Sequence, residues 1–366
     1  MQLQHLDYYY LIYKFKNLTN NRGEQITMKK FYINVQGGCG LNLALASFIT
    51  AANTKYPNEY EFNVCSPYFD IFESCEAVTN VYKPQELKDM IFDAKANDGI
   101  IINQRLYDMN DFIYKRITYS EAWAELMGIK WDEDNSDGSA VKSVLKPETK
   151  YPFLTQQVDN IKKQLNGKKF IIVQWQGGQS PLTQVPADQN GQADWGKVSY
   201  PYDNEPLKRH YPIEKAKEFC NLFKLSHPDV EIIEYSLPNE PHCDNTIRAV
   251  MPYLAYYMLA KDRNCIGTVS IDSSLQHLIA GVTKSVVIWG HSINADNSDK
   301  IIANPFGYKY NKNIVQHCRR DDILFFSALG PSGAKISYIQ PSDLLIEVDN
   351  YLFKSGTSID KNKETK

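Results

Sequence analysis

The sequence lacks several features that identify common protein classes. It has no apolar run long enough to cross a bilayer and no secretory signal segment. Its 7 cysteines are scattered and show no C-x-x-C spacing, so neither a disulfide framework nor a zinc ribbon is indicated. A net charge of −3 gives no global basic field of the kind that non-specific nucleic-acid binders use, although a local basic groove is not excluded. We therefore expect a cytoplasmic protein.

Motifs for several kinds of catalysis are also missing. There is no G-x-S-x-G elbow, and no cysteine has a histidine partner at motif spacing. The string G-C-G-L-N-L at 38–43 lacks the third glycine of a dinucleotide-binding fingerprint, which argues against an NAD enzyme. Asp132-Glu133-Asp134 spells the D-x-D pattern of metal-dependent sugar transferases, but its acidic surroundings favour a solvated linker. No metal ligand set is predicted.

What the sequence does contain is a repeated alternation of strands and helices. From Phe31 onward, β-branched runs alternate with helical segments, which predicts an α/β fold with parallel, doubly wound sheets. Helices are expected over 246–260 and 341–353, among other places. The length of 366 residues suits two domains. We expect a leader at 1–27, a first domain at 28–130, a linker at 131–151, a second domain at 152–340, and a terminal helix with a disordered tail at 341–366.

The first residues carry a separate hypothesis. Arg22-Gly23-Glu24 can be back-translated to a purine-rich ribosome-binding sequence just before Met28, so we interpret 1–27 as translated upstream sequence. The abundance of Asn, Lys and Tyr suggests an A/T-rich bacterial or phage genome.

The stretch Ile266–Gly290 gives the clearest functional signal. It predicts a strand, a turn at Asp272-Ser273-Ser274, a helix and a second strand. Leu275, Leu278, Ile279 and Val282 recur at helical spacing and form the expected buried stripe, with His277 on the other side. A helix N-terminus after a parallel strand can hold phosphate. The alternative is a capped crossover helix with a surface histidine.

The residues D-S-S-L-Q-H-L-I-A-G-V-T-K-S-V-V-I-W-G at 272–290 resemble the signature of glycosyltransferase family 9, the lipopolysaccharide heptosyltransferases. The resemblance implies a GT-B fold, in which two Rossmann-like domains face each other across a cleft. It also implies that Asp272, Ser273, Ser274 and His277 bind the diphosphate of a nucleotide-sugar donor. Ser274 stands where the family usually has glycine.

Other positions match the same family more loosely. Arg209 stands in a segment that resembles the family's Lys-x-Trp-Pro, and by that resemblance would hold donor phosphate; an ordinary basic residue before a helix is the alternative. Glu240 is the corresponding candidate for the donor ribose, or else a solvated loop residue. The loop Gly37, Gly38 and Gly40 would face the acceptor.

The family's catalytic base is the one element that the sequence does not reproduce. Its Gly-Asp carboxylate aligns with Leu41. An inverting transferase needs a group that accepts the proton of the acceptor hydroxyl. Asp70, Asp108 and Asp111 lie at or soon after strand ends in the first domain and are the candidate substitutes, each with an ordinary structural role as the alternative.

These observations predict a metal-independent glycosyltransferase that needs no cofactor. It would move a hexosyl, heptosyl or pentosyl group from a nucleotide diphosphate-sugar to a hydroxyl of a surface glycan, a lipopolysaccharide core or, with less support, modified phage DNA. Because the expected carboxylate is missing, a non-catalytic nucleotide or nucleotide-sugar binding protein on the same fold is the alternative. The sequence does not name the donor base, the sugar or the oligomeric state.

Overall fold

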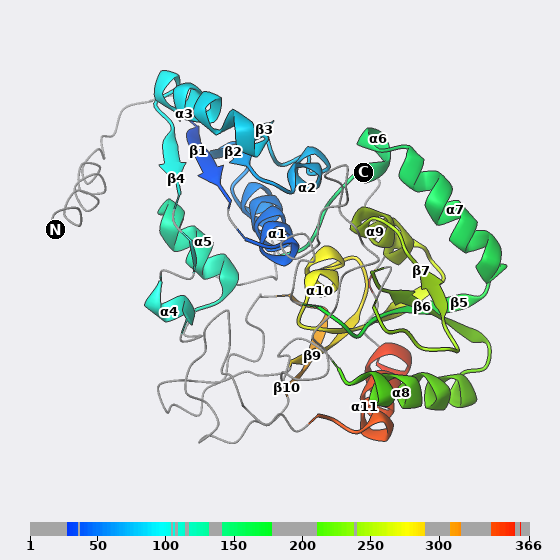
Figure 1. Ribbon diagram of the computed structural model, residues 1–366. Coiled ribbons are helices and arrows are strands. Elements are labelled where there is room, and N and C mark those ends of the chain that lie inside the picture. Colours follow the sequence, from blue (N-terminus) through cyan, green and yellow to red (C-terminus); the bar gives the residue numbers. More distant parts are fainter. Residues whose placement is uncertain are drawn as a thin grey trace, which may run out of the picture.

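The computed structural model describes residues 28–35, 37–103, 105–106, 109–113, 117–131, 141–177, 211–237, 240–289, 308–315, 338–355 and 359. In Figure 1 the chain forms two α/β halves, with the first half (blue to cyan) at the upper left and the second (green to red) along the right side and below. The predicted α/β class is therefore confirmed.

The first half is built on a 4-stranded parallel sheet in the order β3-β2-β1-β4. Phe31 and Ile33 on one face of the inner strand β1 are fully buried and Tyr32 on the other face is 2% exposed, as expected for a strand covered on both faces. The four strands are β1 (Lys29–Asn34), β2 (Tyr60–Cys65), β3 (Asn80–Tyr82) and β4 (Ile100–Ile102).

The helices of the first half follow the expected alternation. The longest, α1, is unusual because almost its whole middle is buried, from Leu41 to Ala52. Helix α5 begins with a capping box in which Thr118 accepts from the Glu121 amide at 3.2 Å, as its sequence predicts. The helices are α1 (Cys39–Lys55), α2 (Phe69–Glu73), a 3-10 turn (Pro84–Glu86), α3 (Leu87–Ala96), α4 (Asn110–Ile113) and α5 (Tyr119–Met127).

The second half contains a 6-stranded parallel sheet in the order β10-β9-β8-β5-β6-β7. Strand β8 lies between β9 and β5, so the turn that follows it is at the middle of the sheet's carboxyl edge. The strands are β5 (Lys169–Gln174), β6 (Val230–Tyr235), β7 (Ile247–Ala249), β8 (Cys265–Ile271), β9 (Ser285–Trp289) and β10 (Asn311–Val315).

Helices of the second half pack on this sheet and on one another. Helix α11 packs on α8, and its Leu344 and Val348 are fully buried, so the terminal helix is part of the second core. The helices are α6 (Pro147–Lys150), α7 (Phe153–Leu165), α8 (Ile213–Ser226), α9 (Tyr253–Lys261), α10 (Ser274–Leu278), α11 (Pro341–Val348) and a π-helical turn (Asp349–Lys354).

Two helices differ from their predicted extents. The helix expected over 246–260 is an edge strand, β7, followed by Pro252 and then α9. Proline disfavours helical geometry in the residue before it, so Pro252 separates the two elements. Helix α10 is only five residues long. It ends early because Gly281 has a φ of +75° and approaches Lys142 so closely that a Cβ atom would lie 2.4 Å from the lysine Cβ.

The two halves meet where α1 packs against α10 (Figure 1). Ser143 lies at this junction, where its hydroxyl hydrogen-bonds with Ser47 of α1 at 3.0 Å and donates to the His277 carbonyl at 2.5 Å. Val141 and Leu145 are buried. The described part of the expected linker, 141–151, is thus packed between the halves, where Ser143 contacts both of them.

Candidate functional site

The predicted donor turn lies at the carboxyl end of β8 and is held by its own side chains. Asp272 is 8% exposed, and its Oδ1 accepts from the Gln276 side chain at 2.5 Å. The Ser273 hydroxyl lies 3.4 Å from Gln174 Nε2, and the Ser274 hydroxyl lies 3.4 Å from the hydroxyl of Tyr235. The turn therefore presents hydroxyl groups at a sheet edge where open α/β proteins bind ligands.

One amide of α10 already has a side-chain partner. The backbone N–H of Leu275 donates to Oε1 of Gln174, at 3.3 Å. Gly177, two residues beyond Trp175, approaches so closely that a Cβ atom there would lie 2.3 Å from the Ser273 hydroxyl. The segment after β5 thus lies against the turn after β8, and a donor phosphate at this helix end would have to displace the Gln174 carboxamide.

His277 is buried rather than exposed, contrary to the surface position that the helical stripe suggested. It is 5% exposed, and its Nδ1 lies 2.9 Å from the Tyr308 hydroxyl. The other side of the ring faces α1, where a Cβ atom on Gly40 would lie 2.8 Å from Cδ2 and 3.2 Å from Nε2. The cause is that α10 packs on α1, so the side opposite the predicted stripe is also covered. His277 therefore joins the predicted donor turn to the predicted acceptor loop.

The glycine loop is fixed by the first turn of α1. Gly37 has a φ of +124°, which favours glycine, and the Asn42 side chain donates to the Gly38 carbonyl at 2.9 Å. Asn42 also accepts from the Ser66 hydroxyl at 2.6 Å, which links the loop to the end of β2. Gly38 is exposed, with open space where a Cβ atom would be. The loop is thus rigid at Gly37 and Gly40 and open at Gly38.

The three candidate bases are in different situations. Asp70 is half-buried on α2, directly after β2 and the glycine loop's partner Ser66. Asp111 is exposed on the short helix α4. Asp108 lies outside the described residues. The structure places Asp70 against Tyr253 of the second half.

Asp70 has a partner from the second half of the chain. Its Oδ1 accepts from the hydroxyl of Tyr253, the first residue of α9, and from the backbone N–H of Ile71 at 3.1 Å. Burial raises the pKa of the Asp70 carboxyl, and the hydrogen bond from Tyr253 opposes that rise. A carboxylate with a raised pKa and some solvent access has the properties of a general base.

Neighbouring side chains connect Asp70 to the donor turn. Cys39, the first residue of α1, is close enough to Asp70 that burial and the Asp70 charge together raise the pKa of its thiol. Burial and the proximity of Cys39 likewise raise the pKa values of Tyr253 and Tyr235. Tyr235 in turn reaches the Ser274 hydroxyl. Hydrogen bonds and electrostatic interactions therefore link the glycine loop, Asp70, the turn after β8 and three tyrosines into one polar group between the halves.

Sequence reasoning missed the tyrosines of this group. Tyr68, Tyr235 and Tyr253 lie before α2, at the end of β6 and at the start of α9, and all three are only partly buried. No spacing rule connects them, because three separate crossovers bring them together. The available signal was their position at strand ends or helix starts, where α/β proteins place ligand contacts.

The predicted ribose residue is at the same edge of the second sheet. Glu240 is 9% exposed, and its Oε2 accepts from the Leu237 amide at 2.7 Å. Burial raises the pKa of this carboxyl. Arg248 supports the loop by donating to the Leu237 carbonyl at 2.8 Å and to the Glu240 carbonyl at 3.2 Å. Glu240 is thus a constrained loop residue rather than a solvated one. Arg209 lies outside the described residues.

Two buried carboxamide oxygens near the turn have no hydrogen-bond partner. They are Oε1 of Gln176, just after β5, and Oε1 of Gln276, on α10, and the two side chains are 5% and 0% exposed. Most buried polar atoms in proteins are paired, so an unpaired one calls for an explanation. Hydroxyl groups of a sugar or ribose are suitable donors to such oxygens.

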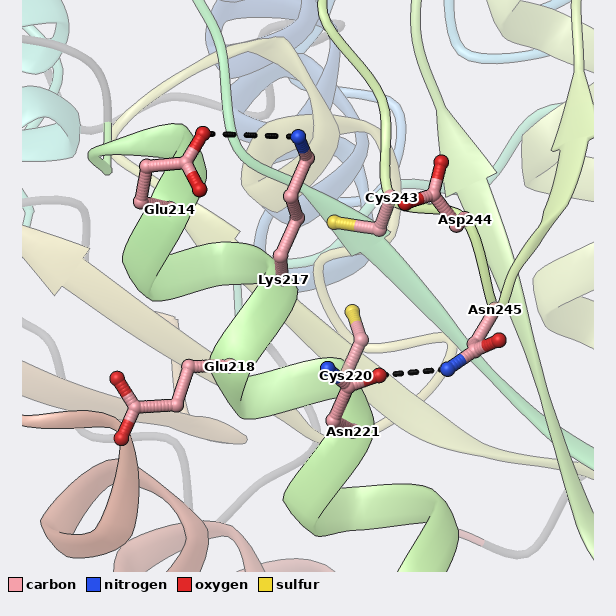
Figure 2. A pocket seen from close by; sticks show the side chains of 8 residues that line it. All are labelled: Glu214, Lys217, Glu218, Cys220, Asn221, Cys243, Asp244 and Asn245. Carbon is pink, nitrogen blue, oxygen red and sulfur yellow. Dashed lines mark hydrogen bonds and ion pairs between the residues drawn. The ribbon is translucent and has the colours of Figure 1, made fainter.

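A separate cavity of about 510 Å³ lies between α8 and the segment before β7 (Figure 2). Figure 2 shows the sulfur atoms of Cys220 and Cys243 directed toward one another at its base. The lining includes three carboxylates and a single lysine, Lys217, which lies 3.5 Å from Glu214. An anionic donor would be repelled there, and none of the predicted site residues lines this cavity.

The described ranges lack two further features. No helix within them has the length and apolar character required to cross a membrane. Likewise, no cluster of three or more His, Cys, Asp or Glu side chains in those ranges is arranged to hold a metal ion.

Comparison with known proteins gives a fold relationship. No family model matches the chain, and no curated sequence matches it. The structure of a glycosyl transferase family 9 protein from Veillonella parvula DSM 2008 aligns over 91% of this chain and 99% of its own, with a TM-score of 0.57 and 9% identity. ADP-heptose lps heptosyltransferase II of E. coli aligns over 89% and 99%, with a TM-score of 0.49 and 11% identity. E. coli heptosyltransferase WaaC with ADP aligns over 88% and 97%, with a TM-score of 0.46 and 10% identity.

The alignment with the Veillonella structure over nearly the whole of both chains shows the fold. The protein has the GT-B arrangement of two Rossmann-like domains, and its resemblance to glycosyltransferase family 9 is confirmed at the level of structure. The low identity agrees with a divergent relationship. A shared fold hosts many chemistries, so function has to be argued from the site.

Proposed function

We propose that the protein is a glycosyltransferase that moves a sugar from a nucleotide diphosphate-sugar to a hydroxyl acceptor. The observation that carries this proposal is the polar group between the halves, which extends from the glycine loop through Asp70 and Tyr235 to the turn at Ser274. It combines a half-buried carboxylate with a set of hydroxyl groups at the carboxyl ends of both sheets. That is where an acceptor hydroxyl and a donor diphosphate have to meet.

The donor would lie on the second half. Its diphosphate would be held at Asp272, Ser273, Ser274 and His277, and its ribose at Glu240. The unpaired oxygens of Gln176 and Gln276 support a polyhydroxylated ligand at this edge. Hydroxyl and N–H donors aimed at the departing diphosphate would stabilise its charge, which is the electrostatic part of catalysis without a metal.

Asp70 would act as the general base. The acceptor hydroxyl transfers its proton to the Asp70 carboxylate, and the acceptor oxygen forms a bond to the anomeric carbon. The bond from that carbon to the diphosphate oxygen breaks, and its electron pair leaves with the nucleoside diphosphate. In the family that the sequence resembles, a carboxylate at the position of Leu41 has this role. Leu41 is a core residue here, 8% exposed and without a titratable group, so Asp70 would take the role instead.

The second candidate is a nucleotide or nucleotide-sugar binding protein without catalysis. Leu41 at the expected carboxylate position and the Gln174 carboxamide on the α10 amide favour it. The two candidates differ in turnover, because a binder would retain saturable nucleotide affinity and release no sugar. The acceptor stays open within the first proposal: a surface glycan, a lipopolysaccharide core or modified DNA.

The experiment that tests the donor site is a thermal-shift screen with ADP, UDP, GDP, CMP, dTDP and their common sugar conjugates. A ligand at a hundred times its dissociation constant adds about 2.7 kcal/mol of stability, which is a clear rise in melting temperature. The rise should be lost in Asp272→Ala and His277→Ala and retained in His242→Ala, whose side chain is exposed. No rise with any nucleotide would refute the donor site.

A further inference from the structure

We propose that Tyr253 is a positioning residue that sets the orientation of Asp70 from the opposite half of the molecule. This inference rests on the proposed function, in which Asp70 is the base. Tyr253 begins α9 in the second half, whereas Asp70 lies on α2 in the first half, and the Tyr253 hydroxyl donates to Oδ1 of Asp70. The base is therefore oriented by a contact that the second half of the chain supplies.

The hydrogen bonds define which oxygen reacts. Both the Tyr253 hydroxyl and the Ile71 amide donate to Oδ1, so they fix the plane of the carboxyl group through one oxygen. The proton of the acceptor would then go to Oδ2. A hydrogen-bond donor to the ionised Asp70 also favours the carboxylate over the carboxylic acid, and the carboxylate is the form that a base needs.

Helix α9 is a rigid platform for this contact. Tyr256 and Tyr257 are fully buried, and the Tyr256 hydroxyl donates to the Ala249 carbonyl. The Tyr257 hydroxyl accepts from the Leu145 amide at 2.9 Å. Tyr253 differs from both because it is only partly buried and its partner is a titratable side chain of the other half. The Tyr253 ring also packs against the core, but its hydroxyl contacts a carboxylate, whereas the hydroxyls of the other two tyrosines contact backbone groups.

The titration of Asp70 depends on groups from several elements. The groups that face it, or whose own titration responds to its charge, come from α1, α2, the segments before α2 and α7, and α9. They are Cys39, Tyr68, Glu73, Tyr151 and Tyr253. Burial is the main cause that raises the pKa of Asp70, and the Tyr253 bond is the largest of the causes that lower it. Removing that hydroxyl should therefore raise the pKa of Asp70 further.

The same helix offers a matched control. The Tyr151 hydroxyl donates to Oε2 of Glu73, so α2 carries two carboxylates that each accept from a tyrosine. Tyr151→Phe removes one hydroxyl from an equivalent contact three residues from Asp70. It leaves Asp70, the proposed base, and its hydrogen bond from Tyr253 intact.

The experiment compares wild type, Tyr253→Phe, Tyr151→Phe and Asp70→Asn in the release of nucleoside diphosphate from the nucleotide-sugar that the thermal-shift screen identifies, with surface glycan, lipopolysaccharide core or DNA supplied as the hydroxyl acceptor. Asp70→Asn should lose turnover. Tyr253→Phe should lower kcat about tenfold or more, the range expected for a hydrogen bond to a charged group, with little change in the donor KM. The acid limb of its pH profile should move to higher pH. Tyr151→Phe should behave as the wild type.

The outcomes separate the two proposals. If Asp70→Asn is inactive while Tyr253→Phe keeps the wild-type kcat and acid limb, the positioning role is wrong and the base is unaffected. An equal effect of Tyr151→Phe would also overturn it, because the effect would then belong to α2 in general. Failure of the wild type to release diphosphate from any donor it binds would refute the proposed function.

A second measurement protects against a folding defect in Tyr253→Phe. The bond favours ionised Asp70, so the loss of stability in Tyr253→Phe should grow as pH rises through the raised pKa of Asp70 and level off above the still higher pKa of Asp70 in the variant. In an Asp70→Asn background that growth should disappear. A pH-independent loss of stability in both backgrounds would contradict the proposal.

Discussion

Gly40→Ala is a sharp test of the contact between the predicted acceptor loop and the predicted donor turn. The new Cβ atom would lie 2.8 Å from Cδ2 and 3.2 Å from Nε2 of His277. Carbon atoms in contact are about 3.5–4.0 Å apart, so α1 and α10 would have to separate by roughly 0.7 Å. The His277 ring cannot simply rotate away, since it is buried and hydrogen-bonded to Tyr308.

The magnitude follows from two opposing effects. Overpacking a well-packed contact costs about 1–3 kcal/mol, whereas alanine is favoured over glycine in a helix by about 1 kcal/mol. We therefore expect a net loss of stability of about 0–2 kcal/mol. Activity should fall further, because a misplacement of about 1 Å can lower a rate about 100-fold. A large loss of kcat with a small change in melting temperature is the expected signature.

Gly38→Ala is the matched stability control in the same loop. No atom lies within 4 Å of its new Cβ, and its φ of −78° suits any residue. Its activity reports on the acceptor instead, because the glycine loop would face the acceptor. The assay is release of nucleoside diphosphate from the donor, together with the melting temperature of each variant. Wild-type activity of Gly40→Ala would refute the reasoning, because the contact with His277 would then have no bearing on the reaction.

Three further variants test other parts of the structure. The stability of Asp70→Asn relative to the wild type should rise as pH rises above 3.8, the value for a free aspartate, and should level off above the raised pKa of Asp70, because burial disfavours the ionised carboxyl. Urea unfolding at several pH values measures this difference, and a pH-independent difference would contradict the prediction. Thr118→Ala should lose about 1 kcal/mol through loss of the capping box at α5, seen as a lower melting temperature, whereas an unchanged value would show that the cap is dispensable. Lys284→Met should cost about 1–3 kcal/mol because the lysine donates to the carbonyls of Tyr351 and Leu352, and unchanged unfolding by urea would refute that role.

Much of the fold could be predicted from local patterns. Most strands of both sheets are short apolar runs bounded by polar residues, with β7, expected to be part of a helix, as an exception, and the capping box at Thr118 marks the start of α5. The extent of α10 could not be predicted, because the stripe of Leu275 and Leu278 continues to Ile279 and Val282 while the close approach of Gly281 to Lys142 ends the helix. That approach is a tertiary contact, and no local pattern contains it.

The site was predictable only in part. The turn at Asp272 and the glycine loop could be proposed because each follows a strand. The choice of Asp70 over Asp111 needed the structure, because Asp70 is half-buried and accepts a hydrogen bond from Tyr253, which is far away in sequence, whereas Asp111 is exposed. The burial of His277 also depends on the packing of one half on the other.

Turnover in the Asp70→Asn variant decides whether this site performs glycosyl transfer. The measurement is the release of nucleoside diphosphate from the bound nucleotide-sugar, with donor affinity followed in parallel by thermal shift. We predict that the wild type turns the donor over, and that Asp70→Asn binds it with unchanged affinity and releases no diphosphate. Saturable binding without release by the wild type, or full activity of Asp70→Asn, would contradict the proposed reaction.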